Sequence, residues 1–289
     1  MRLVCYNIQY GRGKDGRIDL ARIAAELAAL DADVLALQEV EVGWQRSGGV
    51  DQPAALAAWL PGYFSLYLPG FDLHGTQGRR QFGNMLLARQ PIWSARAIPL
   101  PKLPASDAFN MDLGAVEGLL NSSAGPLRLV SLQLSPLTLA ERLLQIDTLL
   151  ERHRSAPGQG GAWTGPALVR GVTDWSNGEA PPPATASAIL LGDFNLVADG
   201  ADYAHLAAEF VDAWRHLALP EADGITYPAH ADWPNPMRID YAFVTRDLAP
   251  LLRAARVESA ALGSDHDPLV IELAADLLAP PLAKMSQLG

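Results

Sequence analysis

Short runs of apolar residues that lead into polar side chains recur along the chain. Residues 2–8, 33–39 and 188–193 each contain four consecutive apolar positions, a pattern typical of strands buried on both faces of a sheet. Each run ends in or beside a polar residue, and the carboxyl end of a strand is where α/β folds place their chemistry. The pattern therefore predicts interior strands whose ends open into a cleft.

A spacing of three and four residues between leucines and isoleucines predicts two amphipathic helices. The first follows Asp19, a favoured N-cap residue. The second follows Thr138, which is spaced from Glu141 as in a capping box. Their apolar stripes are Leu20, Ile23, Leu27 and Leu30, and Leu139, Leu143, Ile146 and Leu150. Shorter helices are expected from Pro53 onward and at residues 202–210 and 211–217.

Between the two long helices, several predicted strands follow one another without an intervening helix. They cover residues 63–68, 83–89, 92–98, 113–119 and 127–134. Consecutive strands of this kind pair as antiparallel hairpins, so the sheet structure cannot be purely parallel. A polar loop is expected at residues 69–80. Three further strands, at residues 238–244, 256–262 and 269–273, complete the prediction.

Residues 155–187 differ from the rest of the chain because they are rich in glycine and proline. We interpret them as a long surface insertion in a single domain of residues 1–289, since the preceding helix and the following strand require the same core. Trp163 and Trp175 suggest that part of the insertion packs onto the body. It is either a lid over the cleft or a plain insertion.

The composition limits which cellular compartment and which classes of partner are expected. The formal net charge is -10, from 22 basic and 32 acidic residues, which argues against a broad cationic surface for nucleic acid. The single Cys5 rules out an intrachain disulfide and fits a reducing compartment. No secretory leader is visible, and no apolar run approaches the ~20 residues that span a bilayer. We expect a cytoplasmic protein without a transmembrane segment, whose oligomeric state is open.

Six polar residues at or beyond the predicted strand ends, and Asp240 within the predicted strand at 238–244, are candidates for chemistry. Asp193 and Asn195 follow Gly192, which permits a sharp turn, and their spacing places both side chains on one face of an extended segment. Such a pair can hold a water, a metal ion or a phosphate oxygen, although aspartate and asparagine are also common in turns without chemistry. The other members are Asn7, Glu39, Asp240, Asp265 and His266.

Together these residues have the chemistry of a phosphate site. Two carboxylates suit a hard cation such as Mg²⁺, which keeps coordination positions for water and substrate phosphate. Asp240 lies among apolar neighbours, and because an unpaired buried charge is costly we expect it to have a partner, His266. An imidazole backed by a carboxylate has a fixed orientation and a raised pKa, which suits it to a phosphate oxygen.

Two of the assignments have ordinary alternatives. Glu39 could be a solvated strand end, which is common for a single glutamate. Arg79 and Arg80 are the best local basic pair near a cleft, and they either bind the substrate or are simply solvated.

Six short segments carry the candidate residues in a definite order. They are Tyr6-Asn7-Ile8, Leu37-Gln38-Glu39-Val40, Gly83-Asn84, Gly192-Asp193-Phe194-Asn195, Arg238-Ile239-Asp240-Tyr241 and Ser264-Asp265-His266. This order resembles the endonuclease/exonuclease/phosphatase superfamily, also called the DNase I-like fold, from about residue 2 to residue 273. The resemblance implies a four-layer α/β sandwich, in which two mixed, mostly antiparallel β-sheets pack face to face with helices on both outer sides.

The resemblance also implies hydrolysis of a phosphoester by water with the help of a metal ion. Glu39 would bind Mg²⁺, for which Mn²⁺ can substitute, and Asn7 and Asp265 would help to hold the ion or its waters. Asp193 would orient and deprotonate the attacking water.

The remaining roles concern the substrate. Asn195 would contact the phosphate, and His266, held by Asp240, would stabilise the charge of the transition state. The expected substrate-binding residues are Asn84, Gln133, Arg79 and Arg80, and we expect Asn84 to be an exposed amide that opens the strand at residues 83–89.

Two positions depart from the pattern of the superfamily. Many members carry a histidine in the strand before the long helix, where this chain has Gln133, and close relatives often have a histidine where this chain has Gln9. These departures bear on the rate and on protonation of the leaving group.

The leading hypothesis is a Mg²⁺-dependent phosphodiesterase or phosphomonoesterase acting on a phosphorylated small molecule or a lipid head group. The acidic net charge favours this over a nuclease, which is the alternative enzyme. A different class, kept open by Gln9 and Gln133, is a catalytically weak member that binds a phosphorylated ligand or a protein partner. Metal-dependent turnover of a generic phosphodiester separates the enzymes from the binding protein.

Overall fold

The computed structural model describes residues 1–165, 169–170, 173–176, 179–228 and 234–279. Its helices are α1 (Leu20–Ala29), α2 (Gln52–Trp59), α3 (Leu139–Gln159), α4 (Ala201–Ala207) and α5 (Ala213–His216). Its strands are β1 (Arg2–Asn7), β2 (Val34–Val42), β3 (Phe64–Gly75), β4 (Gly78–Ala88), β5 (Ser94–Pro99), β6 (Gly114–Ser122), β7 (Gly125–Gln133), β8 (Val169–Arg170), β9 (Thr173–Asp174), β10 (Ala188–Asp193), β11 (Val211–Asp212), β12 (Asp240–Val244), β13 (Leu252–Val257), β14 (Leu269–Leu273) and β15 (Leu277–Leu278).

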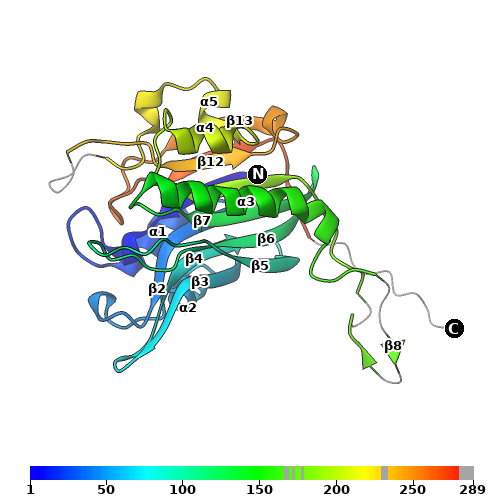
Figure 1. The fold of residues 1–289 in the computed structure, drawn as a ribbon, viewed down its shortest axis with the longest axis horizontal. Coiled ribbons are helices and arrows are strands. Elements are labelled where there is room, and N and C mark those ends of the chain that lie inside the picture. Colours follow the sequence, from blue (N-terminus) through cyan, green and yellow to red (C-terminus); the bar gives the residue numbers. More distant parts are fainter. Residues whose placement is uncertain (166–168, 171–172, 177–178, 229–233, 280–289) are drawn as a thin grey trace.

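Two large sheets form the centre of the molecule (Figure 1). The first has the strand order β13-β14-β1-β2-β4-β3, and the second has the order β11-β12-β10-β7-β6-β15, with β5 also paired to β6. In the part of the chain that the structure describes, β1 pairs with β2 and β10 pairs with β7 in parallel, and the other pairs are antiparallel. The prediction of mixed, mostly antiparallel sheets is confirmed.

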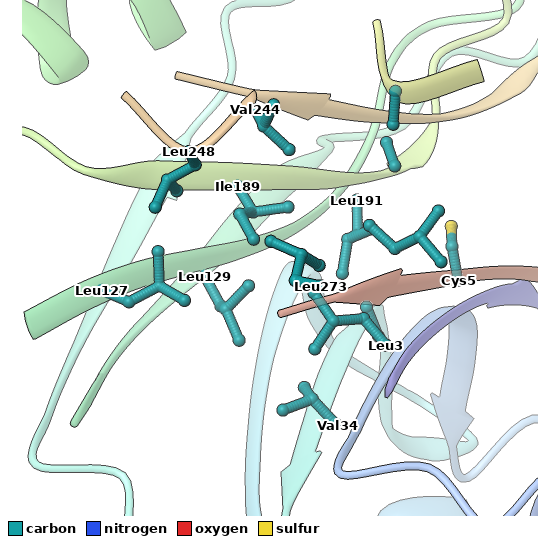
Figure 2. Close-up of a cluster of buried hydrophobic side chains, with 14 of the residues drawn as sticks. Leu3, Cys5, Val34, Leu127, Leu129, Ile189, Leu191, Val244, Leu248 and Leu273 are labelled. Atoms are coloured by element: carbon teal, nitrogen blue, oxygen red, sulfur yellow. The ribbon is translucent and has the colours of Figure 1, made fainter. Parts of the chain in front are cut away.

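Three apolar clusters define the layers of the sandwich. The central cluster lies between the two sheets and contains Leu3, Val34, Leu129 and Ile189 (Figure 2). A second cluster packs α1 and α2 against the outer face of the first sheet, and a third packs α3 and α4 against the outer face of the second. Helices therefore cover both outer sides, which confirms the predicted four-layer sandwich.

The two sheets are also joined by a buried polar contact between the middle of β2 and the carboxyl end of β7. Gln38 Nε2 donates to Ser131 Oγ at 2.9 Å, and Ser131 Oγ donates to Leu37 O at 3.1 Å. Gln38 and Ser131 are fully buried, so these hydrogen bonds form in a low-dielectric interior. The contact fixes one sheet against the other directly beneath the strand ends.

The hairpin of β3 and β4 differs from the sequence prediction. Residues 69–80 were expected to form a polar loop, but β3 runs to Gly75 and β4 begins at Gly78. Polar residues persist on both faces because this part of the hairpin is exposed, so the sequence lacks the alternation that marks a half-buried strand. Pro69 is tolerated because the register shifts beside it and β3 is an edge strand.

The other boundaries differ more modestly. Helix α3 continues through Gln159, so the first residues of the predicted insertion are helical, and the turn follows at Gly160 with a φ of 72°. Strand β13 spans Leu252–Val257, whereas a strand was expected at residues 256–262. Residues 211–217, expected as one helix, divide into β11 and α5, where Asp212 caps the helix by accepting a hydrogen bond from Trp214 N.

The insertion contains β8 and β9, which pair with each other apart from the two main sheets (Figure 1). Residues 166–168, 171–172 and 177–178 of the insertion lie outside the described residues. Trp175 is 80% exposed and Trp163 is half-buried, so only Trp163 is consistent with the expectation that part of the insertion packs onto the body. Among the described helices, none is both long and apolar enough to cross a membrane.

Candidate active site

The carboxyl ends of β1, β7 and β10 and an irregular point within β2 bring the candidate residues together. Asn7 ends β1, Gln133 ends β7 and Asp193 ends β10, while Glu39 lies within β2. Because β1 runs parallel to β2, and β7 runs parallel to β10, the polar residues of each pair emerge at the same edge of their sheet. The face-to-face packing of the sheets then places the two edges against each other.

Two side-chain amides bridge the same pair of carboxylates. Asn7 Nδ2 donates to Glu39 Oε1 at 3.1 Å and to Asp193 Oδ2 at 3.0 Å. Gln133 Nε2 donates to Glu39 Oε1 at 2.8 Å and to Asp193 Oδ2 at 3.4 Å. Glu39 and Asp193 come from different sheets, so this four-residue cluster spans the junction of the sandwich.

The backbone at the cluster adopts uncommon conformations. Glu39 has a φ of 58° and lies where the register between β2 and β4 shifts, between Leu37 and Val40. Such a bulge redirects a side chain that regular pleating would point elsewhere. Gln9 and Asn195 have φ values of 41° and 48°, and non-glycine residues in this region are concentrated at functional sites.

The two carboxylates are electrostatically unfavourable as a pair. Burial raises the pKa of Glu39, the hydrogen bond from Asn7 lowers it, and the charge of Asp265 raises it again, with a net upward shift. Burial raises the pKa of Asp193 to about 7, with the charge of His266 opposing and those of Asp240 and Glu39 reinforcing the shift. The site therefore favours additional positive charge.

A histidine and a buried aspartate lie on the far side of Asp193. His266 Nδ1 donates to Asp240 Oδ2 at 2.8 Å, and His266 Nε2 lies 4.0 Å from Asp193 Oδ2. The edge of the Tyr227 ring packs on the imidazole, with ring centroids 4.9 Å apart. Burial alone would lower the pKa of His266, but the charge and hydrogen bond of Asp240, together with Asp193, raise it to about 10. His266 is therefore a cation at neutral pH.

Hydroxyl groups fasten this pair to the rest of the fold. Ser264 Oγ donates to Asn7 O at 2.7 Å and accepts from His266 N at 3.2 Å, so the 264–266 turn is tied to the end of β1. Thr226 Oγ1 accepts from Asp240 N at 3.0 Å. Thr226, Gln38 and Ser131 were not predicted to support the site. For Gln38 and Ser131 the available signal was a polar residue inside an otherwise apolar strand.

The donor set fits a hard cation with few protein ligands. Gln9 Nε2 donates to Asp265 Oδ2 at 2.6 Å, and Gln9 Oε1 is buried and has no hydrogen-bond partner among the described residues. Within those residues, no three histidine, cysteine, aspartate or glutamate side chains are grouped to share an ion. Mg²⁺ is commonly held by one or two carboxylates plus water and substrate oxygens, so Glu39 and Asp265 suit it better than they suit a closed zinc site.

The two asparagines expected to contact the substrate, Asn195 and Asn84, lie in different places. Asn195 lies at the cluster, where its backbone N donates to Asp193 Oδ1 at 3.0 Å and its Nδ2 donates to Leu134 O at 2.9 Å. Asn84 was expected to be an exposed amide at a strand opening, but it is buried inside β4. Its Nδ2 donates to Gly114 O, so in this structure it joins the two sheets.

The two arginine candidates lie along the β3–β4 hairpin. Arg79 forms an ion pair with Asp72, and Arg80 lies 5.2 Å from the centre of the Trp44 ring. Within the described part of the chain, neither arginine hydrogen-bonds to Asn7, Glu39, Gln133, Asp193 or His266. The structure thus does not bring Arg79 and Arg80 into the cluster.

The chain belongs to the endonuclease/exonuclease/phosphatase family, whose sequence model matches residues 4–266. This confirms the resemblance drawn from the sequence. Members of the family are hydrolases of phosphate esters and generally use divalent metal ions.

Solved structures share the fold. An endonuclease/exonuclease/phosphatase from Beutenbergia cavernae is 23% identical, with a TM-score of 0.66 over 98% of this chain and 73% of that chain. A mannosyl-6-phosphatase from Bacteroides thetaiotaomicron is 17% identical, with a TM-score of 0.58 over 94% and 99%. The catalytic domain of Xenopus laevis APE2 is 16% identical, with a TM-score of 0.62 over 98% and 95%. No curated protein matches the chain significantly in sequence.

Proposed function

We propose that this chain is a Mg²⁺-dependent phosphoester hydrolase that acts on a phosphorylated small molecule or a lipid head group. The observation that carries the proposal is the cluster itself. Two carboxylates from different sheets, Glu39 and Asp193, share amide donors, and a cationic His266 lies beside them. The net charge of -10 supports a small substrate over a nucleic-acid backbone.

Glu39 would hold the metal ion, with Asp265 and Asn7 supporting the ion or its waters. When bound, the ion would supply Lewis-acid stabilisation of charge on the phosphoryl group. Asn7 Nδ2 and Gln133 Nε2 fix the orientation of the Glu39 carboxylate. Since both amides also reach Asp193, metal binding and base positioning depend on the same contacts.

Asp193 is the general base in this proposal. A catalytic base is most effective when its pKa lies near the working pH, and the surroundings of Asp193 raise its pKa to about 7. Asn195 N holds Oδ1, and the two amides hold Oδ2, so the carboxylate has little rotational freedom. It accepts the proton of the attacking water.

His266 stabilises the negative charge that develops on phosphoryl oxygens. Asp240 keeps the imidazole charged and fixes its orientation through Nδ1. Nε2 then presents an N–H donor next to Asp193, where the water attacks. Preorganised donors of this kind act on the transition state without reorganising during the reaction.

The proposal is tested by hydrolysis assays combined with removal of the principal metal ligand. The wild type should hydrolyse an activated aryl phosphodiester with Mg²⁺ or Mn²⁺ and should lose activity with EDTA. Glu39→Gln should weaken Mg²⁺ binding by at least about 10-fold, measured by calorimetry, because loss of a charged ligand costs no less than loss of a residue that only supports a ligand. Glu151→Gln, an exposed position on α3, is the control and should bind Mg²⁺ like the wild type. Equal Mg²⁺ affinity in Glu39→Gln would exclude Glu39 as the ligand.

A second prediction concerns Gln133, which is buried at the centre of the cluster. Its amide can donate a hydrogen bond, but it cannot supply a proton near neutral pH. Lack of a proton donor costs about 10²–10⁴-fold in rate, mainly for poor leaving groups. The protein should therefore hydrolyse activated aryl phosphodiesters much better than alkyl ones, and Gln133→His should raise alkyl turnover while leaving aryl turnover nearly unchanged.

The comparison of steady-state rates for the two ester classes decides between roles of Gln133. If Gln133→His leaves both rates unchanged, the residue has no part in protonating the leaving group. If both rates fall, the bridge from its amide to Glu39 and Asp193 is required for activity, and proton supply is not limiting.

A further inference from the structure

A cavity of about 180 Å³ adjoins the cluster on the side of Glu39 and Gln133. Most of its wall is apolar. The apolar residues that line it are Phe82, Phe109, Met111, Leu113, Pro136 and Leu137. A cavity of ~150 Å³ lined by apolar side chains accommodates benzene, so this one has the size for a single ring.

Arg46 forms one side of this cavity, but its charge is already compensated. Its Nη2 lies 2.7 Å from Glu41 Oε2, and Glu41 is fully buried. Its guanidinium also lies 4.0 Å from the centre of the Tyr10 ring and 4.6 Å from that of Trp44. Arg46 is therefore a fixed part of the wall, stacked between aromatic rings, and contributes little free charge for an anion.

Phe109, a cavity residue, is largely exposed, with 73% of its surface accessible. Its neighbour Asn110 anchors the segment, because Asn110 Nδ2 donates to Leu103 O at 2.9 Å and to Glu141 Oε2 at 2.8 Å. Glu141 is buried at the start of α3 and also accepts from Leu103 N at 2.8 Å. The Phe109 ring is thus held at the rim of the cavity by an anchored loop. An apolar ligand in the cavity would cover this ring.

We propose that this cavity binds a hydrophobic group of about one ring, aryl or compact branched alkyl, that is carried by the phosphoester. The inference rests on the proposed function, because it takes the phosphoryl group to lie at Glu39 and Asp193. A group attached to that phosphoryl enters the cavity past Gln133, which belongs to both the cluster and the cavity wall. Contact with Phe109 and Leu137 removes apolar surface from water on both molecules.

The test compares phenylphosphonate with methylphosphonate, which carry the same anionic group and differ in the substituent. Each is measured as an inhibitor of aryl phosphodiester hydrolysis and, with Mg²⁺ present, by direct calorimetric titration. Phenylphosphonate should bind about 10-fold more tightly or better, since a pocket gains this much from well-fitted apolar groups. Equal affinity for the two phosphonates overturns the proposal.

Variants of the cavity residues show which side chains cause the preference for phenylphosphonate. Phe109→Ala and Leu137→Ala should each reduce the ratio of the two affinities by about 5-fold, because each removes apolar contact area at the rim. Phe64→Ala is the matched control, since Phe64 is a half-exposed phenylalanine of β3 outside the cavity, and it should leave the ratio unchanged. A ratio that is unaffected by both rim variants overturns the proposal.

Two further outcomes distinguish an apolar cavity from an anion site, and the cavity from the hydrolase activity. If 4-carboxyphenylphosphonate binds more tightly than phenylphosphonate, Arg46 makes the cavity an anion site and the proposal is wrong. If no phosphoester is hydrolysed with any metal ion, but calorimetry shows the phenyl preference and its loss in Phe109→Ala, the cavity assignment stands and the proposed hydrolase activity fails.

Discussion

Replacing Asp193 by asparagine is expected to lower kcat by about 10²–10⁴-fold, the range for loss of a positioned general base. The amide has nearly the same shape but cannot accept a proton from water near neutral pH. Steady-state hydrolysis of an aryl phosphodiester with saturating Mg²⁺ measures the effect. A kcat within a few-fold of the wild type would show that Asp193 is not the base.

The same substitution should stabilise the fold in the absence of metal. The folded protein holds Asp193 with a pKa of about 7, above the unfolded value of 3.8, so the protonated form is favoured by folding. The associated stability is fully present below pH 3.8 and is lost as the pH rises to 7. In EDTA, Asp193→Asn should therefore have a higher Tm than the wild type at about pH 8, and the difference should shrink toward about pH 4.

A second buried aspartate serves as the control for both measurements. Asp212 is buried and its Oδ2 lies 2.9 Å from Arg238 Nη1, so Asp212→Asn breaks an ion pair and should lower the Tm. Its kcat per folded molecule should remain near the wild-type value. A lower Tm for Asp193→Asn at every pH would mean that Asp193 supports the fold, contrary to its electrostatic cost.

The cluster was largely predictable because its signals are local. Asn7, Glu39 and Asp193 each follow an apolar run that identifies a buried strand, and the order of the segments supplied the relation between the strands. Asp240 could be singled out because a carboxylate among apolar neighbours requires a partner. The contact with His266 then followed from the chemistry of both groups, and the structure shows it at 2.8 Å.

Features that depend on contacts distant in sequence were missed. Gln38 and Ser131 are 93 residues apart, and nothing near either residue shows that they meet between the sheets. The bulge that orients the Glu39 side chain depends on the register of β2 against β4. The burial of Asn84 was missed because its hydrogen-bond acceptor, Gly114 of β6, lies 30 residues away and leaves no local signal in the sequence.

The cavity was missed for the same reason. Phe109 and Asn110 belong to a segment without regular structure, and its position depends on the buried carboxylate of Glu141. The sequence around Arg46 gives no indication that it lines a cavity. The contacts of Arg46 with Glu41 and Trp44 are local, whereas its stacking on Tyr10 joins a segment distant in sequence, which no local pattern indicates.

Replacing Asp240 by asparagine is expected to lower kcat by about 10²–10³-fold, the range for loss of a preorganised stabilising group. Asp240 makes the largest contribution to keeping the pKa of His266 near 10 against the opposing effect of burial, and the charges of Asp193 and Asp265 add to it. Without the charge and hydrogen bond of Asp240, the pKa of His266 falls. The imidazole is then neutral over more of the pH range and no longer stabilises phosphoryl charge.

The pH dependence distinguishes this role from simple damage to the site. Wild-type kcat/KM should rise with pH as Asp193 deprotonates, and should fall at alkaline pH as His266 deprotonates. In Asp240→Asn the alkaline fall should move to lower pH, and an NMR titration should show the same displacement for His266. Mg²⁺ affinity should be retained, because Asp240 lies behind the imidazole and hydrogen-bonds to its Nδ1. An unchanged pKa of His266 in the variant would disprove the electrostatic role of Asp240, even if kcat fell.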